Sequence, residues 1–173
     1  MSSNAIPLVG FAAFSGVGKT TLIGKVIPLL LEQGMRVGAI KQTHHDLELD
    51  RPGKDSYELR RAGASPTLLA GPHRWFLAGE YPDGRSPELN DLAARFAPGE
   101  VDLLVVEGFR HQPFPKIEVH RPALGHPLLA TTDPHVVAIA SDAALDVTLP
   151  VLPLNRPEAV ADFIVTHILH TPT

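Results

Sequence analysis

The sequence predicts an α/β protein whose mostly parallel sheet is organised around one glycine-rich turn. Residues 6–14 form a continuous apolar run, which is typical of a strand buried on both faces of a sheet. Residues 13–20 follow in the order of a phosphate-binding turn, and residues 20–33 carry apolar side chains at helical spacing. A second apolar run, residues 101–106, ends in Glu107. Strand, turn, helix and a later strand that ends in an acid together predict this fold class.

Length and composition restrict the class of protein. The chain has 173 residues, so we expect a single domain over residues 1–173. The phosphate-binding turn would make it a nucleotide-binding domain. It contains no cysteine, which excludes disulfides and thiolate metal sites and is expected of a cytoplasmic protein. A net charge of −4 argues against a nucleic acid partner. Because no apolar run is long enough to cross a bilayer, we also expect no membrane association.

The turn at residues 13–20 carries the residue types that bind phosphate, although Ala13 stands where the consensus has its first glycine. Its backbone N–H groups are expected to form an anion-binding nest at the start of the following helix. Lys19 is expected to reach the β- and γ-phosphate oxygens, and the Thr20 hydroxyl suits a Mg²⁺ ligand. The nucleotide-binding residues predicted in this turn are Ser15, Gly16, Val17, Gly18, Lys19 and Thr20.

A polar stretch, residues 41–46, ends a second predicted strand over residues 36–43. In open α/β sheets ligands bind at the carboxyl ends of the strands, so this stretch should face the phosphates. Lys41 could neutralise phosphate charge, and Asp46 could hold Mg²⁺ through water. The adjacent His44 and His45 lack the further ligands of a metal site. A polar strand end without a role is the alternative.

The middle of the chain predicts a small β extension beside the main sheet. A short helix over residues 55–62 precedes two strand-like runs, 67–70 and 74–81, so the extension is expected at about residues 66–81. A helix is predicted over residues 86–96. Another strand, residues 116–120, lies among prolines, which indicates an edge strand, and residues 113–122 are a second candidate for the extension.

Glu107 occupies the position of a Walker B acid, at the end of an apolar strand about 90 residues after the turn. A carboxylate there can orient the Mg²⁺ shell or an attacking water. Glu107 and Asp46 are therefore the candidate catalytic residues, and both join Thr20 as candidate metal ligands.

Asp142 follows a clear buried strand, residues 136–141. Its carboxylate could recognise guanine by accepting hydrogen bonds from N1 and N2 of the base. The usual Asn-Lys-x-Asp guanine motif is absent, and a helix cap is the alternative role. A last strand over residues 149–154 and an amphipathic helix over residues 156–169 complete the predicted elements.

These stretches together resemble the MobB family, the molybdopterin-guanine dinucleotide biosynthesis protein B, from residue 6 to residue 167. The residues that carry the resemblance are 15–22, 41–46, 53–64 and 106–110. It implies a three-layer P-loop NTPase fold with helices on both faces of the sheet. It also implies nucleotide binding by residues 15–21, which adds Thr21, and a metal-proximal acid at Glu107.

The resemblance further implies a homodimer that binds GTP with Mg²⁺, hydrolyses it slowly at most, and assists a MobA-type guanylyltransferase. That partner couples GMP to molybdopterin, and whether molybdopterin itself contacts this chain stays open. Two alternatives remain. One is a small-molecule kinase with Asp46 as its base, and the other is a nucleotide-binding adapter without catalysis.

Overall fold

The computed structural model describes residues 6–43, 45, 47, 51–81, 85, 87–97 and 99–169. The chain divides into two compact units, one formed by Met1–Gln42 with Leu89–Thr173 and the other by Thr43–Glu88. A single domain over residues 1–173 stays a prediction. None of the helices in the described part of the chain is long and apolar enough to span a bilayer.

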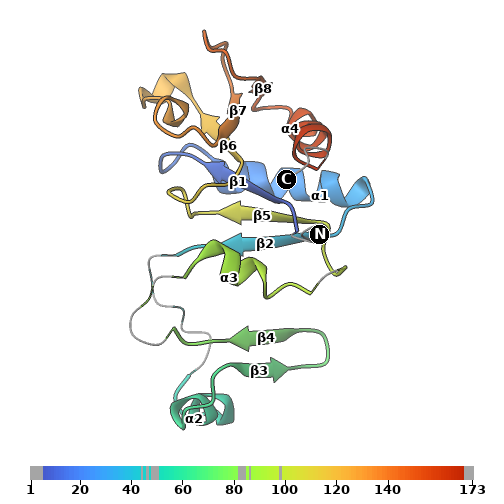
Figure 1. Cartoon of the computed structure of the whole chain (residues 1–173), viewed down its shortest axis with the longest axis vertical. Helices are drawn as coiled ribbons and strands as arrows, with labels where there is room; N and C mark the ends of the chain where they lie inside the picture. The colour runs from blue at the N-terminus through green and yellow to red at the C-terminus, as the bar shows by residue number, and fades with distance from the viewer. Residues whose placement is uncertain are drawn as a thin grey trace, which may run out of the picture. The chain divides into compact units, whose positions relative to one another are not determined.

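The larger unit contains a six-stranded sheet in the order β2-β5-β1-β6-β7-β8 (Figure 1). Its strands are β1 (Leu8–Ala12), β2 (Val37–Lys41), β5 (Leu103–Glu107), β6 (Lys116–His120), β7 (Val136–Ser141) and β8 (Val151–Pro153). All five pairings between neighbouring strands of this sheet are parallel, which confirms the predicted mostly parallel sheet. The carboxyl ends of the strands therefore meet at one edge.

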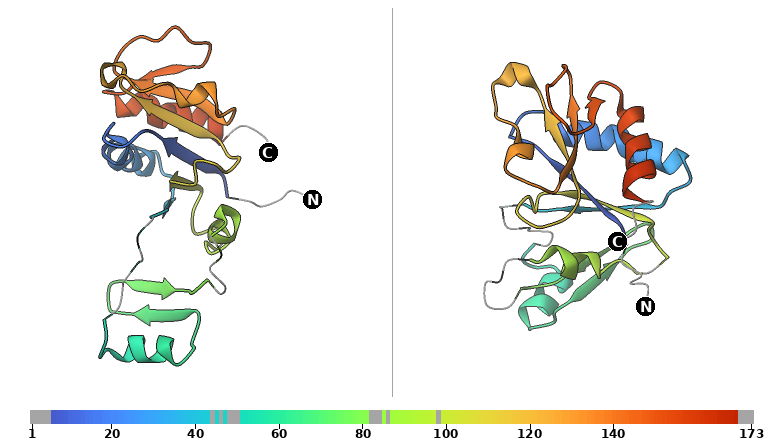
Figure 2. Two further views of the ribbon diagram at one scale, coloured as in Figure 1. Left: turned by 90° about the vertical axis from the view of Figure 1, so that its left-hand side faces the viewer. Right: turned by 45° about the horizontal axis from the view of Figure 1, so that its top comes forward.

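Helices cover both faces of this sheet, as predicted (Figure 2). On one face α1 (Lys19–Glu32) packs against α4 (Pro157–Phe163), which continues as a π-helical turn, Ile164–Ile168. Their apolar side chains share a core with β1, β5, β6 and β7. On the other face the short helix α3 (Leu89–Ala93) packs over β5 and β2. The predicted helix over residues 86–96 is thus shorter, and Ser86, the predicted first residue, lies outside the described residues.

Strand β6 lies inside the sheet, paired with β1 on one side and β7 on the other. The prediction that residues 113–122 form an edge strand or part of a β extension is therefore wrong. The prolines that suggested an edge flank the strand and do not interrupt it, so each residue of β6 retains an N–H group for the ladder.

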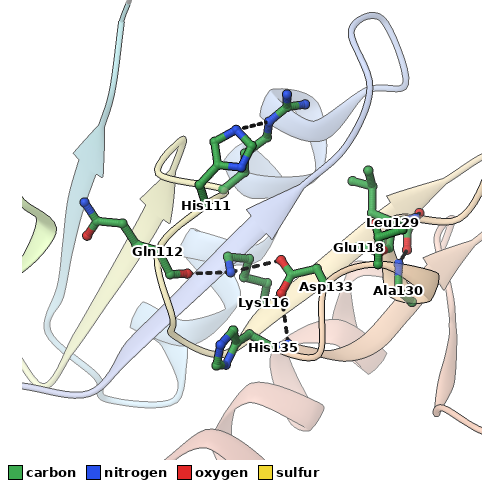
Figure 3. A network of polar contacts seen from close by, with 10 residues as sticks. His111, Gln112, Lys116, Glu118, Leu129, Ala130, Asp133 and His135 are labelled. Carbon is green, nitrogen blue, oxygen red and sulfur yellow. Dashed lines mark hydrogen bonds and ion pairs between the residues drawn. The ribbon is translucent and has the colours of Figure 1, made fainter.

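The side chains on one face of β6 are charged or polar and still buried. Lys116 has a side chain only 2% exposed; its ammonium group donates to the Gln112 carbonyl at 2.7 Å and to Asp133 at 3.0 Å (Figure 3). Burial raises the pKa of Asp133, but the His135 N–H and the Lys116 ammonium lower it by more, so the net direction is downward. The buried charge is thus paired and hydrogen-bonded, as a buried charge must be.

Glu118, the next inward residue of β6, binds the segment that covers this part of the sheet. Its two carboxylate oxygens accept the Leu129 and Ala130 N–H groups, each at 2.9 Å, at the start of a 3₁₀ turn, Leu129–Thr131 (Figure 3). An earlier 3₁₀ turn, Pro122–Leu124, begins the same segment. Backbone hydrogen bonds to Glu118 therefore contribute to holding this cover on β6.

The smaller unit contains α2 (Asp55–Arg61) and a hairpin of β3 (Thr67–Ala70) and β4 (Trp75–Ala78). The two strands pair antiparallel, which confirms a hairpin at residues 66–81. Arg60 of α2 forms an ion pair with Glu80 at 2.8 Å, which links the helix to the segment after β4.

Candidate functional site

The glycine-rich turn lies between β1 and α1, as the sequence predicts. Gly16 and Gly18 have φ of 79° and 102°, a left-handed conformation that favours glycine. The Val17 side chain between them is 3% exposed and belongs to the main core, so it anchors the turn. Ser15 and Gly16 are exposed. The buried Val17 side chain thus fixes the turn to the core, while Ser15 and Gly16 stay accessible.

Helix α1 begins at Lys19, directly after the turn, and is 14 residues long. The first N–H groups of a helix have no partner within it, and its dipole is positive at this end, so an anion is stabilised here. Thr20 and Thr21 are exposed in the first helical turn. This start of α1 carries the amides and the two hydroxyls that the sequence predicts for phosphate binding.

Glu107, at the end of β5, contacts three of the predicted site residues. The Thr20 hydroxyl donates to Glu107 Oε1 at 3.1 Å. Lys19 Nζ lies 3.8 Å from Oε1, and Lys41 Nζ, at the end of β2, lies 3.7 Å from Oε2. Their nearness follows from the strand order, which places β5 between β2 and β1. A carboxylate and a hydroxyl side by side form an oxygen donor set that suits Mg²⁺.

Gln42 fixes the turn after Glu107 and was not predicted. Its N–H donates to the Glu107 carbonyl at 2.8 Å, and its side-chain oxygen accepts from the Phe109 N–H at 2.9 Å. Phe109 has φ of 52°, which is unusual for a residue with a side chain, and its ring is buried. The position of Gln42 in the polar stretch after β2 was the available sequence signal.

Asp142, after β7, is held by Arg121, a second residue that was not predicted. Arg121 follows β6 directly, and its NH1 lies 2.5 Å from Asp142 Oδ2. Its Nε donates to the Val17 carbonyl in the turn at 3.0 Å. The position after a strand was a usable signal for Arg121, but the mistaken edge assignment of β6 concealed it.

The other polar residues near the predicted strand ends have contacts of their own or lie outside the described residues. Asp46 and His44 lie outside them. The His45 N–H donates to the Thr43 hydroxyl at 3.1 Å, and Arg110 donates to His111. Within the described residues no group of three or more metal-ligating His, Cys, Asp or Glu side chains occurs.

Comparisons with known proteins agree with one another. The family model for molybdopterin guanine dinucleotide synthesis protein B matches residues 8–142. A molybdopterin-guanine dinucleotide biosynthesis adapter protein of Escherichia coli (strain K12) is 49% identical over 161 residues, 92% of each chain. One from Haemophilus influenzae is 40% identical over 97% of this chain and 93% of that one. The solved structure of Bacillus subtilis MobB superposes with a TM-score of 0.72 at 25% identity, over 96% of this chain and all of that one.

Proposed function

The chain belongs to the MobB family, and from this membership we propose that it is a GTP-binding adapter in molybdenum cofactor biosynthesis that assists formation of the molybdopterin guanine dinucleotide. The observation that carries the nucleotide-binding part is the accessible turn before α1, with Lys19, Thr20 and Glu107 gathered beside it. Adapter is also the word in the names of the two relatives from Escherichia coli and Haemophilus influenzae.

The proposed phosphate contacts divide between backbone and side chain. The amides of Ser15 to Gly18 and the start of α1 would bind the phosphate oxygens, and Lys19 would balance their charge. The Lys19 side chain is 24% exposed and lies 3.8 Å from Glu107, so it is already held over this end of the sheet. Lys41, 63% exposed, would add a second positive charge.

Mg²⁺ fits the oxygen donors of this cluster. The Thr20 hydroxyl and the Glu107 carboxylate would hold it, and Asp46 remains a further candidate ligand. When bound, the ion would neutralise part of the triphosphate charge. Guanine would be recognised by Asp142, whose carboxylate has further acceptor positions besides the one that Arg121 uses.

Hydrolysis is proposed to be slow. Efficient P-loop hydrolases use a glutamine to orient water and an arginine to stabilise the transition state. Here the Gln42 side-chain oxygen is bonded to the Phe109 N–H, and the Arg110 guanidinium is bonded to His111. Both groups therefore have other partners. The small-molecule kinase remains the alternative, with Asp46 as its base.

We further propose a homodimer in the cytoplasm that works with a MobA-type guanylyltransferase. These points rest on family membership.

The test is calorimetric titration with GTP, ATP and inorganic tripolyphosphate, each with and without Mg²⁺. We expect binding of GTP and tripolyphosphate, strengthened by Mg²⁺, and weaker binding of ATP than of GTP. Failure of both GTP and tripolyphosphate to bind would refute the proposal. Phosphate release and GDP or ADP formation, both measured with and without small-molecule acceptors, separate the slow hydrolase from the kinase. Only a kinase would show acceptor-dependent GDP or ADP formation, because its γ-phosphate goes to the acceptor and not to water.

A further inference from the structure

We propose that Arg121 is a positioning residue that joins the base-recognising carboxylate of Asp142 to the phosphate-binding turn, and thereby helps to set the preference for guanine. The inference rests on the GTP-binding function proposed above. It is carried by two hydrogen bonds from one guanidinium group, Nε to the Val17 carbonyl at 3.0 Å and NH1 to Asp142 Oδ2 at 2.5 Å.

The sheet topology puts Arg121 between the two parts of the site. It directly follows β6, which lies between β1, the strand before the turn, and β7, the strand before Asp142. The side chains of Arg121 and Asp142 are 36% and 24% exposed. A charge-assisted hydrogen bond that is partly shielded from water is stronger and more directional than one at an open surface, so this pair can fix an orientation.

On the phosphate side, Arg121 constrains the peptide between Val17 and Gly18. The described part of the chain has its one cis peptide bond at Ser65-Pro66, so this peptide is trans. In a trans peptide the N–H points away from the carbonyl. By binding the Val17 carbonyl, Arg121 therefore also directs the Gly18 N–H, one of the amides expected to bind phosphate.

On the base side, Arg121 orients the Asp142 carboxylate. A carboxylate has two oxygens and about four acceptor positions, and the bond from Arg121 uses one position on Oδ2. The others can accept from N1 and N2 of guanine, which are both donors. Adenine presents an acceptor at N1, which a carboxylate repels. A carboxylate held in one orientation discriminates better than a rotating one, because discrimination needs both oxygens at once.

The experiment compares Arg121→Gln, Arg121→Lys and the unaltered chain by calorimetric titration with GTP, ATP and tripolyphosphate in Mg²⁺. We expect Arg121→Gln to lower the ratio of GTP to ATP affinity by about tenfold, the loss of one charge-assisted hydrogen bond. Tripolyphosphate affinity should fall less than GTP affinity. Arg121→Lys keeps the charge, but a single ammonium group lacks the planar guanidinium geometry that reaches both partners. We therefore expect the ratio of GTP to ATP affinity to fall by about threefold.

Arg36→Gln is the matched control, because Arg36 forms the same kind of ion pair with Asp102, also at 2.5 Å. It removes the same charge, and the GTP to ATP ratio should not change. Thermal unfolding monitors the fold of each variant, and Arg121→Lys decides the question if Arg121→Gln does not fold.

An unchanged ratio in the Arg121 variants would overturn the inference. An equal loss for all three ligands would also overturn it, since Arg121 would then act on the turn alone. Combining Arg121→Gln with Asp142→Asn should lower the ratio little beyond either change alone, and additive losses would contradict the coupling. If the unaltered chain binds no GTP, the proposed function fails together with this inference. If it binds and prefers GTP but the variants do not differ, the inference alone fails.

Discussion

The Thr20 hydroxyl donates a hydrogen bond to Glu107 Oε1 at 3.1 Å, although the two residues are 87 positions apart in the chain. One belongs to the helix after the turn and the other ends the neighbouring strand β5. The contact brings together the two sequence signals from which a nucleotide site was predicted. The same carboxylate lies within 4 Å of two ammonium groups, Lys19 and Lys41, so positive charge exceeds negative charge in this cluster.

Replacing Lys19 with alanine should remove most of the affinity for GTP. Loss of about two charge-assisted hydrogen bonds to phosphate corresponds to roughly 3 kcal/mol, or on the order of 100-fold in affinity. Calorimetric titration measures this. Lys25→Ala, an exposed lysine on the same helix, is the control and should bind as the unaltered chain does. Wild-type affinity in Lys19→Ala would contradict the assigned role of this ammonium group.

Glu107→Gln should weaken the effect of Mg²⁺ more than nucleotide binding itself. The amide keeps the shape and can still accept from Thr20, but it lacks the charge that a divalent ion needs. We expect the gain in GTP affinity on adding Mg²⁺ to fall about tenfold, and slow phosphate release to fall with it. Glu32→Gln, at the exposed end of α1, controls for the charge change. An unaltered Mg²⁺ dependence would exclude Glu107 from the metal site.

Asp133→Ala should destabilise the protein by about 3 kcal/mol, because it leaves the buried Lys116 ammonium without its carboxylate. Urea unfolding measures the free energy. The double variant Lys116→Met/Asp133→Leu is the informative comparison, since removing both charges removes the unpaired group. It should lose less stability than Asp133→Ala. A double variant that is less stable than Asp133→Ala would argue against a buried-charge penalty.

Acid should weaken the fold partly through Asp102. Hydrogen bonds from the Arg36 guanidinium and the Arg36 N–H lower the pKa of Asp102 to about 2, from an ordinary value of 3.8. A group whose pKa is lower in the folded state stabilises above the unfolded value, and this contribution disappears as the pH falls from 3.8 to about 2.

As the pH falls from about 4 to about 2, Asp102→Asn should therefore lose less free energy of unfolding than the unaltered chain. Urea unfolding at several pH values across this range measures the difference. Asp146→Asn, at an exposed position, should keep the full pH dependence in that window. Identical pH profiles for Asp102→Asn and the unaltered chain would contradict the role of the Arg36 pair.

Local patterns predicted the part of the site that lies close to the turn. The turn has the residue order of a phosphate-binding turn, and Glu107 ends an apolar strand. The two were expected to lie close together because parallel strands have their carboxyl ends at the same edge of the sheet. Strand β7 matches its predicted range, residues 136–141, because a fully buried strand is a continuous apolar run.

The positions of Arg121 and Gln42 after strands were usable signals, but their contacts could not be predicted from them, because these depend on which strands are neighbours. The alternating pattern of β6 places Lys116 and Glu118 on one face, and the prolines around the strand suggested an edge. Only the folded chain shows that Asp133 and the Leu129 and Ala130 amides satisfy these charges. Because β6 was predicted to be an edge strand, the sequence did not place Arg121 beside Asp142.

The two main-chain bonds to Glu118 make its cover segment tolerant of one kind of change and sensitive to another. Since the N–H groups of Leu129 and Ala130 belong to the backbone, exchanging either side chain for another leaves the bonds in place, unless proline removes the donor. Inserting or deleting a single residue between β6 and position 129 would instead shift both donors away from the carboxylate. In this stretch, spacing matters more than residue identity.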